Sequence, residues 1–215
     1  MLNSKAKDQS PKTLGAILLA AGRSERMGAF KPLLPFGKKT VVEACINYLR
    51  EGGIENIVVV VGHRPDEIRE QLKTSSLSFA VNPDADSEMS VSIACGVLQL
   101  PETMPATLIA LVDHPAIPGS VVTALRREWE KGARLVLPTW ERRGGHPVLI
   151  DLNLRNELLN LDPARGLKGL FDLHQHEVRR VPVDSPYIAR DMDTWDDYRN
   201  LYEDVFGAKP PQSGP

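Results

Sequence analysis

The chain has 215 residues, of which 42% are hydrophobic and 25% are charged, the composition of an ordinary globular domain. Its formal net charge of −2 provides no global field for nucleic acid or for an anionic membrane, and we expect neither as a partner. No apolar run approaches the ~20 residues that span a bilayer, and residues 1–12 lack the apolar stretch of a secretory signal.

Short β-branched runs alternate with helical patterns along the chain. The apolar runs lie at residues 14–20, 56–62, 107–112 and 134–138. The helical patterns lie at residues 40–52, 65–72, 90–98 and 121–129. Continuous apolar runs predict strands that are covered on both faces, so the alternation predicts a three-layer α/β fold with a mostly parallel sheet. We expect one domain, residues 13–206, between disordered tails at 1–12 and 207–215.

Local signals mark where the predicted helices begin. Thr40 and Glu43 form a capping box, and Pro65 opens the second helix. Ser90 is expected to cap the third helix. The inward face of that helix is expected to contain Ile93, Val97 and Leu98.

We expect no catalytic or metal-binding role for the cysteines or for two of the histidines. Cys45 and Cys95 fall in apolar helical patterns, so we expect them to pack in a reducing compartment, and the protein to be cytoplasmic. His174 and His176 are two residues apart, a spacing that places them on one face of a strand. Because no Cys or further His lies nearby, we expect no zinc site there.

The loop after the first strand, AAGRSERMGAFKPLLPFG at residues 20–37, has the composition of a phosphate-binding segment. Its small residues let the backbone approach a ligand. Arg23, Arg26 and Lys31 lie within nine positions and would offset the charge of a triphosphate. Neither the dinucleotide pattern G-x-G-x-x-G nor the P-loop ending G-K-[ST] is present. A surface loop with solvated cations explains this composition equally well.

The longer string LAAGRSERMGAFKPLLP resembles the signature L-A-A-G-x-S-x-R-M-G-x-x-K-x-L-L-P of the molybdenum-cofactor cytidylyltransferases and their nucleotidyltransferase relatives. The resemblance implies a Rossmann-like (glycosyltransferase-A-like) nucleotidyltransferase fold, with Arg26 and Lys31 on the phosphates. It also implies CTP rather than GTP, because relatives that use GTP tend to carry L-x-G-G. The nucleotide-binding residues that it implies in this loop are Leu19, Ala20, Ala21, Gly22 and Arg23.

Two further segments match the family in the same order. VNPDADSEMSVSIACGV, at residues 81–97, is similar to N-P-x-x-x-x-G-[ML]-S-x-S. The match implies that the base and ribose are held by Asn82, Ser90 and Ser92. LVDHP, at residues 111–115, resembles L-G-D-x-P and makes Asp113 a metal ligand and catalytic residue. Glu88 and Val112 replace the usual glycines, and Glu88 either narrows the site or points into solvent.

The last two matches concern the acceptor and a second metal ligand. RRGGHPVLI, at residues 142–150, resembles G-x-x-G-H-P-[VI]-L. This match implies an acceptor-binding loop that contains Gly145, His146 and Pro147. RDMDTWDDY, at residues 190–198, resembles D-[IV]-D-T-P-E-D and implies Asp193 as the metal ligand, with Asp191 beside it. Trp195 replaces the usual Pro.

Together these matches imply transfer of CMP from CTP to a phosphorylated acceptor, with molybdopterin (molybdenum cofactor) as the expected acceptor and pyrophosphate as the product. Mg²⁺ is the expected cofactor, with Mn²⁺ as a substitute, and a client molybdoenzyme or its chaperone is an expected partner. Two alternatives stay open. One is a guanylyl or a sugar- or polyol-phosphate nucleotidyltransferase of the same fold. The other is a non-catalytic molybdenum-cofactor carrier, which would not need a pair of metal-binding carboxylates.

Overall fold

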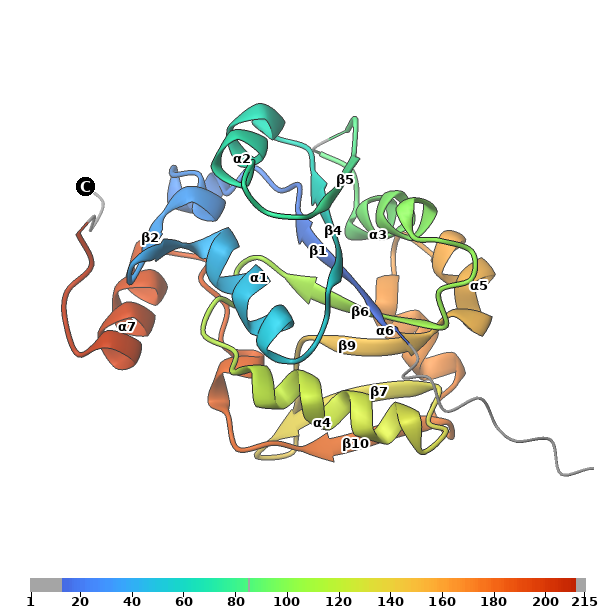
Figure 1. Ribbon diagram of the computed structural model, residues 1–215. Coiled ribbons are helices and arrows are strands. Elements are labelled where there is room, and N and C mark those ends of the chain that lie inside the picture. The colour runs from blue at the N-terminus through green and yellow to red at the C-terminus, as the bar shows by residue number, and fades with distance from the viewer. Residues whose placement is uncertain (1–12, 85, 212–215) are drawn as a thin grey trace, which may run out of the picture.

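The computed structural model describes residues 13–84 and 86–211, and the predicted tail at 1–12 lies outside the described residues. An eight-stranded sheet forms the middle of this part of the chain (Figure 1). Its strands are β1 (Gly15–Ala20), β4 (Asn56–Val61), β5 (Ser78–Val81), β6 (Ala106–Leu111), β7 (Leu135–Trp140), β8 (Arg143–Gly144), β9 (Val148–Asp151) and β10 (Val178–Pro182).

The strand order is β10-β7-β9-β6-β1-β4-β5, with β8 paired to β7. β1 pairs in parallel with both β4 and β6, β4 with β5, and β7 with β10. β9 runs antiparallel between β6 and β7. The prediction of a mostly parallel sheet is therefore confirmed, and the three central parallel strands end at one edge, where ligands bind in α/β folds.

Helices cover both faces of the sheet (Figure 1). They are α1 (Val41–Glu51), α2 (Pro65–Gln71), α3 (Met89–Gln99), α4 (Gly119–Glu130), α5 (Arg155–Leu159), α6 (Gly166–Leu173) and α7 (Trp195–Phe206). α1, α2 and α4 pack on one face, and α3, α5 and α6 pack on the other. This arrangement confirms the three-layer architecture. Short 3-10 turns lie at Glu25–Met27, Lys31–Leu33, Leu152–Leu154 and Pro186–Ala189.

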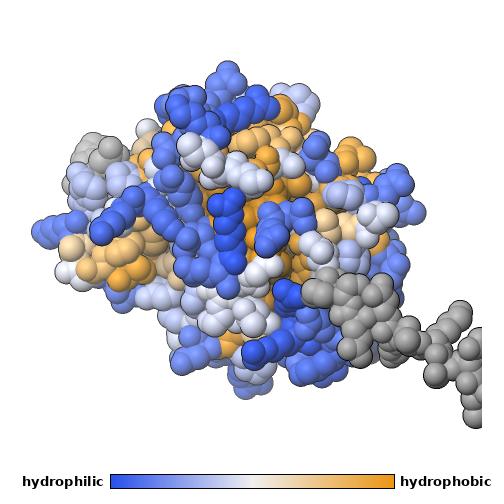
Figure 2. All heavy atoms as spheres, in the orientation of Figure 1, coloured by the Kyte–Doolittle hydropathy of each residue, from blue (hydrophilic) through white to orange (hydrophobic). Residues whose placement is uncertain are grey.

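The last helix packs away from the sheet, beside a small hairpin of β2 (Pro35–Phe36) and β3 (Lys39–Thr40). Tyr198, Leu201 and Tyr202 of α7 form a separate core with Phe36 and Val41. Figure 2 shows apolar side chains at the surface in the region of α7, where Phe206 is 41% exposed. This packing fixes the segment before α7, which contains two of the predicted metal ligands.

The helix starts are partly as the sequence predicts. The capping box of Thr40 and Glu43 is confirmed, with the Thr40 amide donating to Glu43 Oε2 at 2.7 Å. Pro65 is the first residue of α2, as predicted. The prediction that Ser90 caps α3 is wrong, because Glu88 is the N-cap residue and Ser90 lies inside the first turn.

Two other predictions of local structure are also wrong. Leu98 is 69% exposed, because five helical positions place it about 140° around the helix axis from the buried Ile93. His174 and His176 do not share a strand, since His174 follows α6 and lies between Glu157 and Glu177. Beyond residue 206, Gly207 ends α7 in a left-handed conformation and Pro210 is buried, although the composition of 207–215 predicts a tail; residues 212–215 lie outside the described part.

Candidate functional site

A cavity of about 270 Å³ opens at the carboxyl ends of β1, β5 and β6. The site predictions bring together at this cavity Leu19, Ala21, Gly22, Lys31, Asn82, Ser92 and Asp113. These residues come from separate stretches of the sequence, and the parallel pairing of β6, β1, β4 and β5 carries the loops after β1, β5 and β6 to one edge of the sheet. The remaining lining residues are Ser24, Pro32, Ser87, Met89, Leu111 and Val112.

The loop after β1 forms one wall because a neighbouring loop holds it closely. The His63 amide, which follows β4, donates to the Ala21 carbonyl at 3.1 Å. A Cβ on Gly62 would lie 2.9 Å from the same carbonyl oxygen, so only glycine permits this approach. Ala21 itself is only 6% exposed. This wall of the cavity is therefore closely packed and uncharged at Ala21.

The opposite wall is built around Asn82. Its side chain is buried, and its amide nitrogen donates to Ser87 Oγ and to Ser92 Oγ, each at 2.9 Å. Its carbonyl oxygen accepts the amide of Asp84 at 3.0 Å. Asn82 thus holds two hydroxyls at the cavity, while Ser87 donates in turn to the Asp84 carbonyl. Ser92 lines the cavity, and its hydroxyl hydrogen is still free to rotate toward a ligand there.

Three of the predicted nucleotide-binding residues do not line the cavity. Ala20 is fully buried in the core, and Ser90 is buried with no partner for its hydroxyl among the described residues. Arg23 is half exposed and forms an ion pair with Asp86 at 2.7 Å, which joins the loop after β1 to the loop before α3. The side chains of these three residues therefore lie around the cavity and do not face its interior.

The two cations predicted to bind phosphates both contact Asp193. Lys31 Nζ lies 2.7 Å from Asp193 Oδ1, and the Arg26 guanidinium forms an ion pair with Asp193 Oδ2. Lys31 is buried and lines the cavity, whereas the Arg26 side chain is 76% exposed. The structure therefore joins the loop after β1 to the segment before α7 through one carboxylate.

Asp113 lies just beyond β6 and also lines the cavity. Burial raises the pKa of its carboxyl, but the hydrogen bond from His114 and the nearby charges of His114 and Lys31 outweigh burial and leave that pKa below its usual value. The Met192 amide donates to the Asp113 carbonyl at 3.1 Å, so the segments that carry Asp113 and Asp193 lie side by side.

Two carboxylates on neighbouring segments are the kind of donor set that suits a divalent ion completed by its substrate. Among the described residues, no group of three or more His, Cys, Asp or Glu side chains is placed to hold a metal. Mg²⁺ is commonly held by one or two carboxylates, with waters and substrate phosphates filling its other positions. Asp191, the third predicted ligand, is exposed and has no ion pair or hydrogen bond in the described part of the chain.

The predicted acceptor loop lies next to Asp113 but outside the cavity. A Cβ on Gly145 would lie 2.1 Å from the Ile188 carbonyl oxygen, so this glycine is required by packing. The His146 amide donates to that carbonyl at 2.8 Å. Burial, followed by the charge of His114, lowers the pKa of His146 to about 4, and its ring is therefore neutral at neutral pH. Pro147 is buried.

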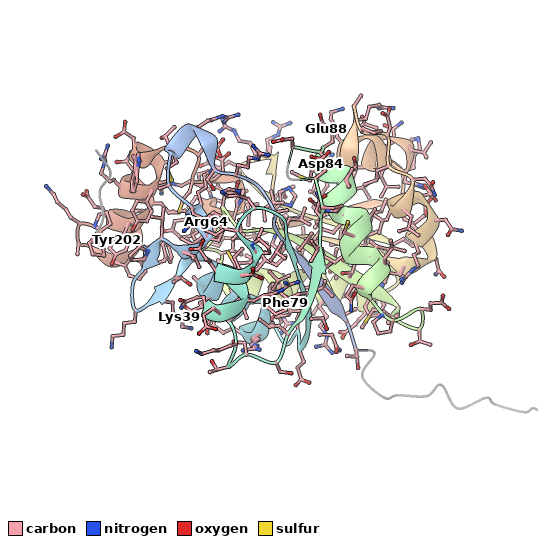
Figure 3. The ribbon with its side chains drawn as sticks, turned by 90° about the horizontal axis from the view of Figure 1, so that it is seen from above. Lys39, Arg64, Phe79, Asp84, Glu88 and Tyr202 are labelled. Carbon is pink, nitrogen blue, oxygen red and sulfur yellow. The ribbon has the colours of Figure 1, made fainter. Side chains whose placement is uncertain are left out.

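The three departures from the family pattern have different consequences. Glu88 is exposed and does not line the cavity, so it points into solvent; Figure 3 shows it beside the start of α3, near Asp84. Val112 continues the β6 ladder by donating its amide to the Leu19 carbonyl at 3.1 Å, and it lines the cavity. Trp195 packs edge-on against Tyr198, with ring centroids 5.8 Å apart.

Sequence reasoning missed several lining residues that its own motifs contained. Ser24 is the serine of the A-A-G-x-S string, and its hydroxyl accepts the Lys31 amide at 3.3 Å. Ser87 and Met89 flank the position where the family has glycine. The motif spacing was therefore a sufficient signal for these residues, whereas nothing in the sequence predicted the bond between His114 and Asp113.

A mostly parallel α/β sheet with a small-residue loop, a buried lysine and a strand-end aspartate at one edge is typical of a nucleotide-binding transferase. The model of the MobA-like NTP transferase domain matches residues 16–192, and the chain belongs to this family.

The relatives carry several different names. The chain is 40% identical over 121 residues to the bifunctional IPC transferase and DIPP synthase of Rubrobacter xylanophilus, covering 54% of this chain but only 27% of that protein. It is 24% identical to the molybdenum cofactor cytidylyltransferase of Escherichia coli, covering 86% and 93% of the two chains. It is 32% identical to the nicotine blue oxidoreductase of Paenarthrobacter nicotinovorans, covering 65% and 71%.

Solved structures agree in fold. The homologue of Mycobacterium tuberculosis Rv0371c from Mycobacterium sp. strain JC1 has a TM-score of 0.79 at 28% identity, covering 89% of this chain and 96% of that one. Rv0371c of Mycobacterium tuberculosis, solved in complex with manganese, has a TM-score of 0.75 at 25% identity, covering 90% and 100%. In the described part of this chain, no helix is both long and apolar enough to cross a membrane.

Proposed function

We propose that the protein transfers CMP from CTP to a phosphorylated acceptor, with molybdopterin as the acceptor and pyrophosphate as the other product, in the cytoplasm. The observation that carries this proposal is the placement of Lys31 and Asp113 in one cavity with the A-A-G loop. Support for the acceptor comes from the name of the Escherichia coli relative, which matches over 86% of this chain. The product would pass to a client molybdoenzyme or its chaperone.

The chemistry requires no general base. An acceptor phosphate is already anionic near neutral pH, with a second pKa of ~6. Its oxygen bonds to the α-phosphorus while the bond from that phosphorus to the oxygen bridging the β-phosphate breaks, and the electron pair leaves with pyrophosphate. The leaving group gathers negative charge, which Lys31 and Arg26 would offset. Both cations must first exchange Asp193 for the phosphates.

Asp113 and Asp193 would hold the divalent ion, with Asp191 at the periphery of the site. The ion, Mg²⁺ or Mn²⁺, supplies charge neutralisation and polarises the α-phosphorus. The Asp113 carboxyl is ionised at neutral pH because its pKa lies below the usual value, so it is ready to bind a cation. Gly145, His146 and Pro147 would bind the acceptor, since His146 interacts electrostatically with Asp113 and their loop is therefore close to that carboxylate.

A second candidate is a transferase that uses a sugar or polyol phosphate, or GTP, in place of molybdopterin or CTP. The 40% identity to the bifunctional IPC transferase and DIPP synthase of Rubrobacter xylanophilus, whose name gives a different activity, supports this second candidate. The test is pyrophosphate release from each of the four NTPs with Mg²⁺, in the presence of a molybdopterin-type acceptor, a polyol phosphate, or no acceptor. CTP with the pterin acceptor should give the fastest release. Binding of CTP without release in any reaction would contradict catalysis and favour a carrier.

A further inference from the structure

His114 is a buried histidine whose side chain contacts the carboxylate of the preceding residue. It is 6% exposed, and its Nδ1 lies 2.7 Å from Asp113 Oδ1. The chain turns directly after β6, where the His114 amide donates to the Leu111 carbonyl at 3.3 Å. This turn lets two consecutive side chains meet, which an extended strand would not allow because they would point to opposite faces.

The contact leaves the two oxygens of Asp113 in different states. Oδ1 is engaged by His114, while Oδ2 has no hydrogen bond in the part of the chain that the structure describes. Asp113 lines the cavity, and His114 does not. A donor on one carboxylate oxygen fixes the rotation of the group about its last torsion, which is otherwise broad. The other oxygen then remains available to a ligand in a set direction.

His114 is itself supported from the acceptor-loop side. Its ring lies 5.9 Å from that of His146, with the two planes inclined at 55°. His146 is held in turn by the Ile188 carbonyl, which accepts its amide at 2.8 Å, and by the Ile109 carbonyl at 3.5 Å from Nδ1. His114 therefore occupies a fixed place between Asp113 and the loop that contains His146.

We propose that His114 is a positioning residue that holds the Asp113 carboxylate in the orientation that binds the divalent ion. This inference rests on the proposed function. His114 contacts neither the cavity nor any reacting atom, so its contribution passes entirely through Asp113. Partners of this kind behind a metal ligand change metal affinity by ~10–100-fold when they are removed.

The test separates the hydrogen bond from simple packing. His114→Asn keeps an amide donor near the position of Nδ1, whereas His114→Phe and His114→Leu remove the donor and bracket the imidazole in size. His174→Leu is a matched control, because it removes the contacts of another histidine with carboxylates, Glu157 at 2.6 Å and Glu177 at 3.1 Å, and none of these residues lines the cavity. Two donor-free variants keep the test valid if one of them fails to fold, which thermal melting reports.

The measurement is Mn²⁺ binding in the presence of CTP and without acceptor, followed by the paramagnetic resonance signal of free Mn²⁺. We expect His114→Phe and His114→Leu to weaken Mn²⁺ binding by ~10-fold or more, with His114→Asn and His174→Leu staying close to the parent protein. Pyrophosphate release by the donor-free variants should recover as Mg²⁺ is raised.

Equal weakening in the Asn variant and in the donor-free variants would assign His114 to packing and overturn the proposal. Parent-like Mn²⁺ affinity in a folded donor-free variant would overturn it as well, while leaving the proposed function intact. A parent protein that binds no Mn²⁺ with CTP would overturn both.

Discussion

The two segments that carry the predicted metal ligands hold their carboxylates in opposite ways. Asp113 follows a central strand and is oriented by a histidine, with no ion pair to Lys31 or to any arginine in the described residues. Asp193 precedes α7, and its side chain is 31% exposed and paired with two cations. The family pattern implies that both aspartates bind the metal, but in the structure the two carboxylates have different partners.

The difference has a consequence for binding. The cations that contact Asp193 are the ones expected to bind the triphosphate, so the nucleotide and Asp193 compete for Lys31 and Arg26. Asp113 has no such competition. We therefore expect Asp113 to contribute the same geometry before and after binding, and the segment before α7 to change its ionic partners when the nucleotide enters.

The largest effect should come from the fixed carboxylate. Asp113→Ala should lower the rate of pyrophosphate release by ~10²–10³-fold, since it removes a ligand of the divalent ion that would offset the negative charge developing in the transition state. Asp193→Ala should also lower the rate by orders of magnitude. Comparing the two rates shows which of the two metal-binding segments contributes more to catalysis. Steady-state release with saturating CTP measures this.

The control for these variants is Asp196→Ala. Asp196 is exposed at the start of α7, and its partner is Arg199 rather than any residue of the cavity. Its replacement should leave the rate unchanged, and thermal melting should show that all three variants fold. A nearly normal rate for Asp113→Ala would rule out the proposed chemistry.

A smaller effect is expected from the cations that Asp193 holds. Lys31→Met should weaken CTP binding by ~10–100-fold, because a hydrogen bond to a charged group contributes ~1.5–3 kcal/mol. Arg26→Ala should weaken it less, since a highly exposed side chain gains only ~0–1 kcal/mol from an ion pair. Titration with CTP and Mg²⁺, monitored by the shift in melting temperature, measures both. If CTP shifts the melting temperatures of both variants as much as that of the parent protein, the cations of this loop are solvated surface residues that do not bind the triphosphate.

The sequence predicted the regular parts of this molecule better than its side-chain contacts. The parallel sheet brought Lys31 and Asp113 together as expected, because motifs at the ends of adjacent parallel strands meet at one edge. The start of α3 was misplaced by two residues, since the cap depends on the extended backbone of Glu88 and not on residue type alone.

The chemistry around Asp193 was beyond sequence reasoning for a physical reason. Its partner Lys31 is 162 positions away in the chain, and only the packing of α7 beside the β2–β3 hairpin brings the two together. His114 was overlooked for the opposite reason. It is adjacent to Asp113, but a contact between neighbours depends on the turn after β6, which the motif does not specify.

The smallest effect should come from the uncharged wall of the cavity, and it should concern selectivity rather than rate. Ala21 lines the cavity and is 6% exposed, and we expect its methyl to occupy space that a two-ring purine would need. One methyl is worth ~1–3 kcal/mol, or ~10–200-fold, in discrimination. Ala21→Gly should therefore narrow the preference of kcat/KM for CTP over GTP without abolishing the use of CTP, because Ser92 remains in place.

Ala20→Gly is the matched control, since Ala20 is fully buried and does not line the cavity. It should lower stability by ~0.5–1 kcal/mol, the usual effect of glycine within a strand, and leave the preference unchanged. A parent protein that prefers GTP would show that the assignment of cytosine as the base is wrong. Selectivity for the base would then have to come from residues other than Ala21, even if the charged residues still determine the rate.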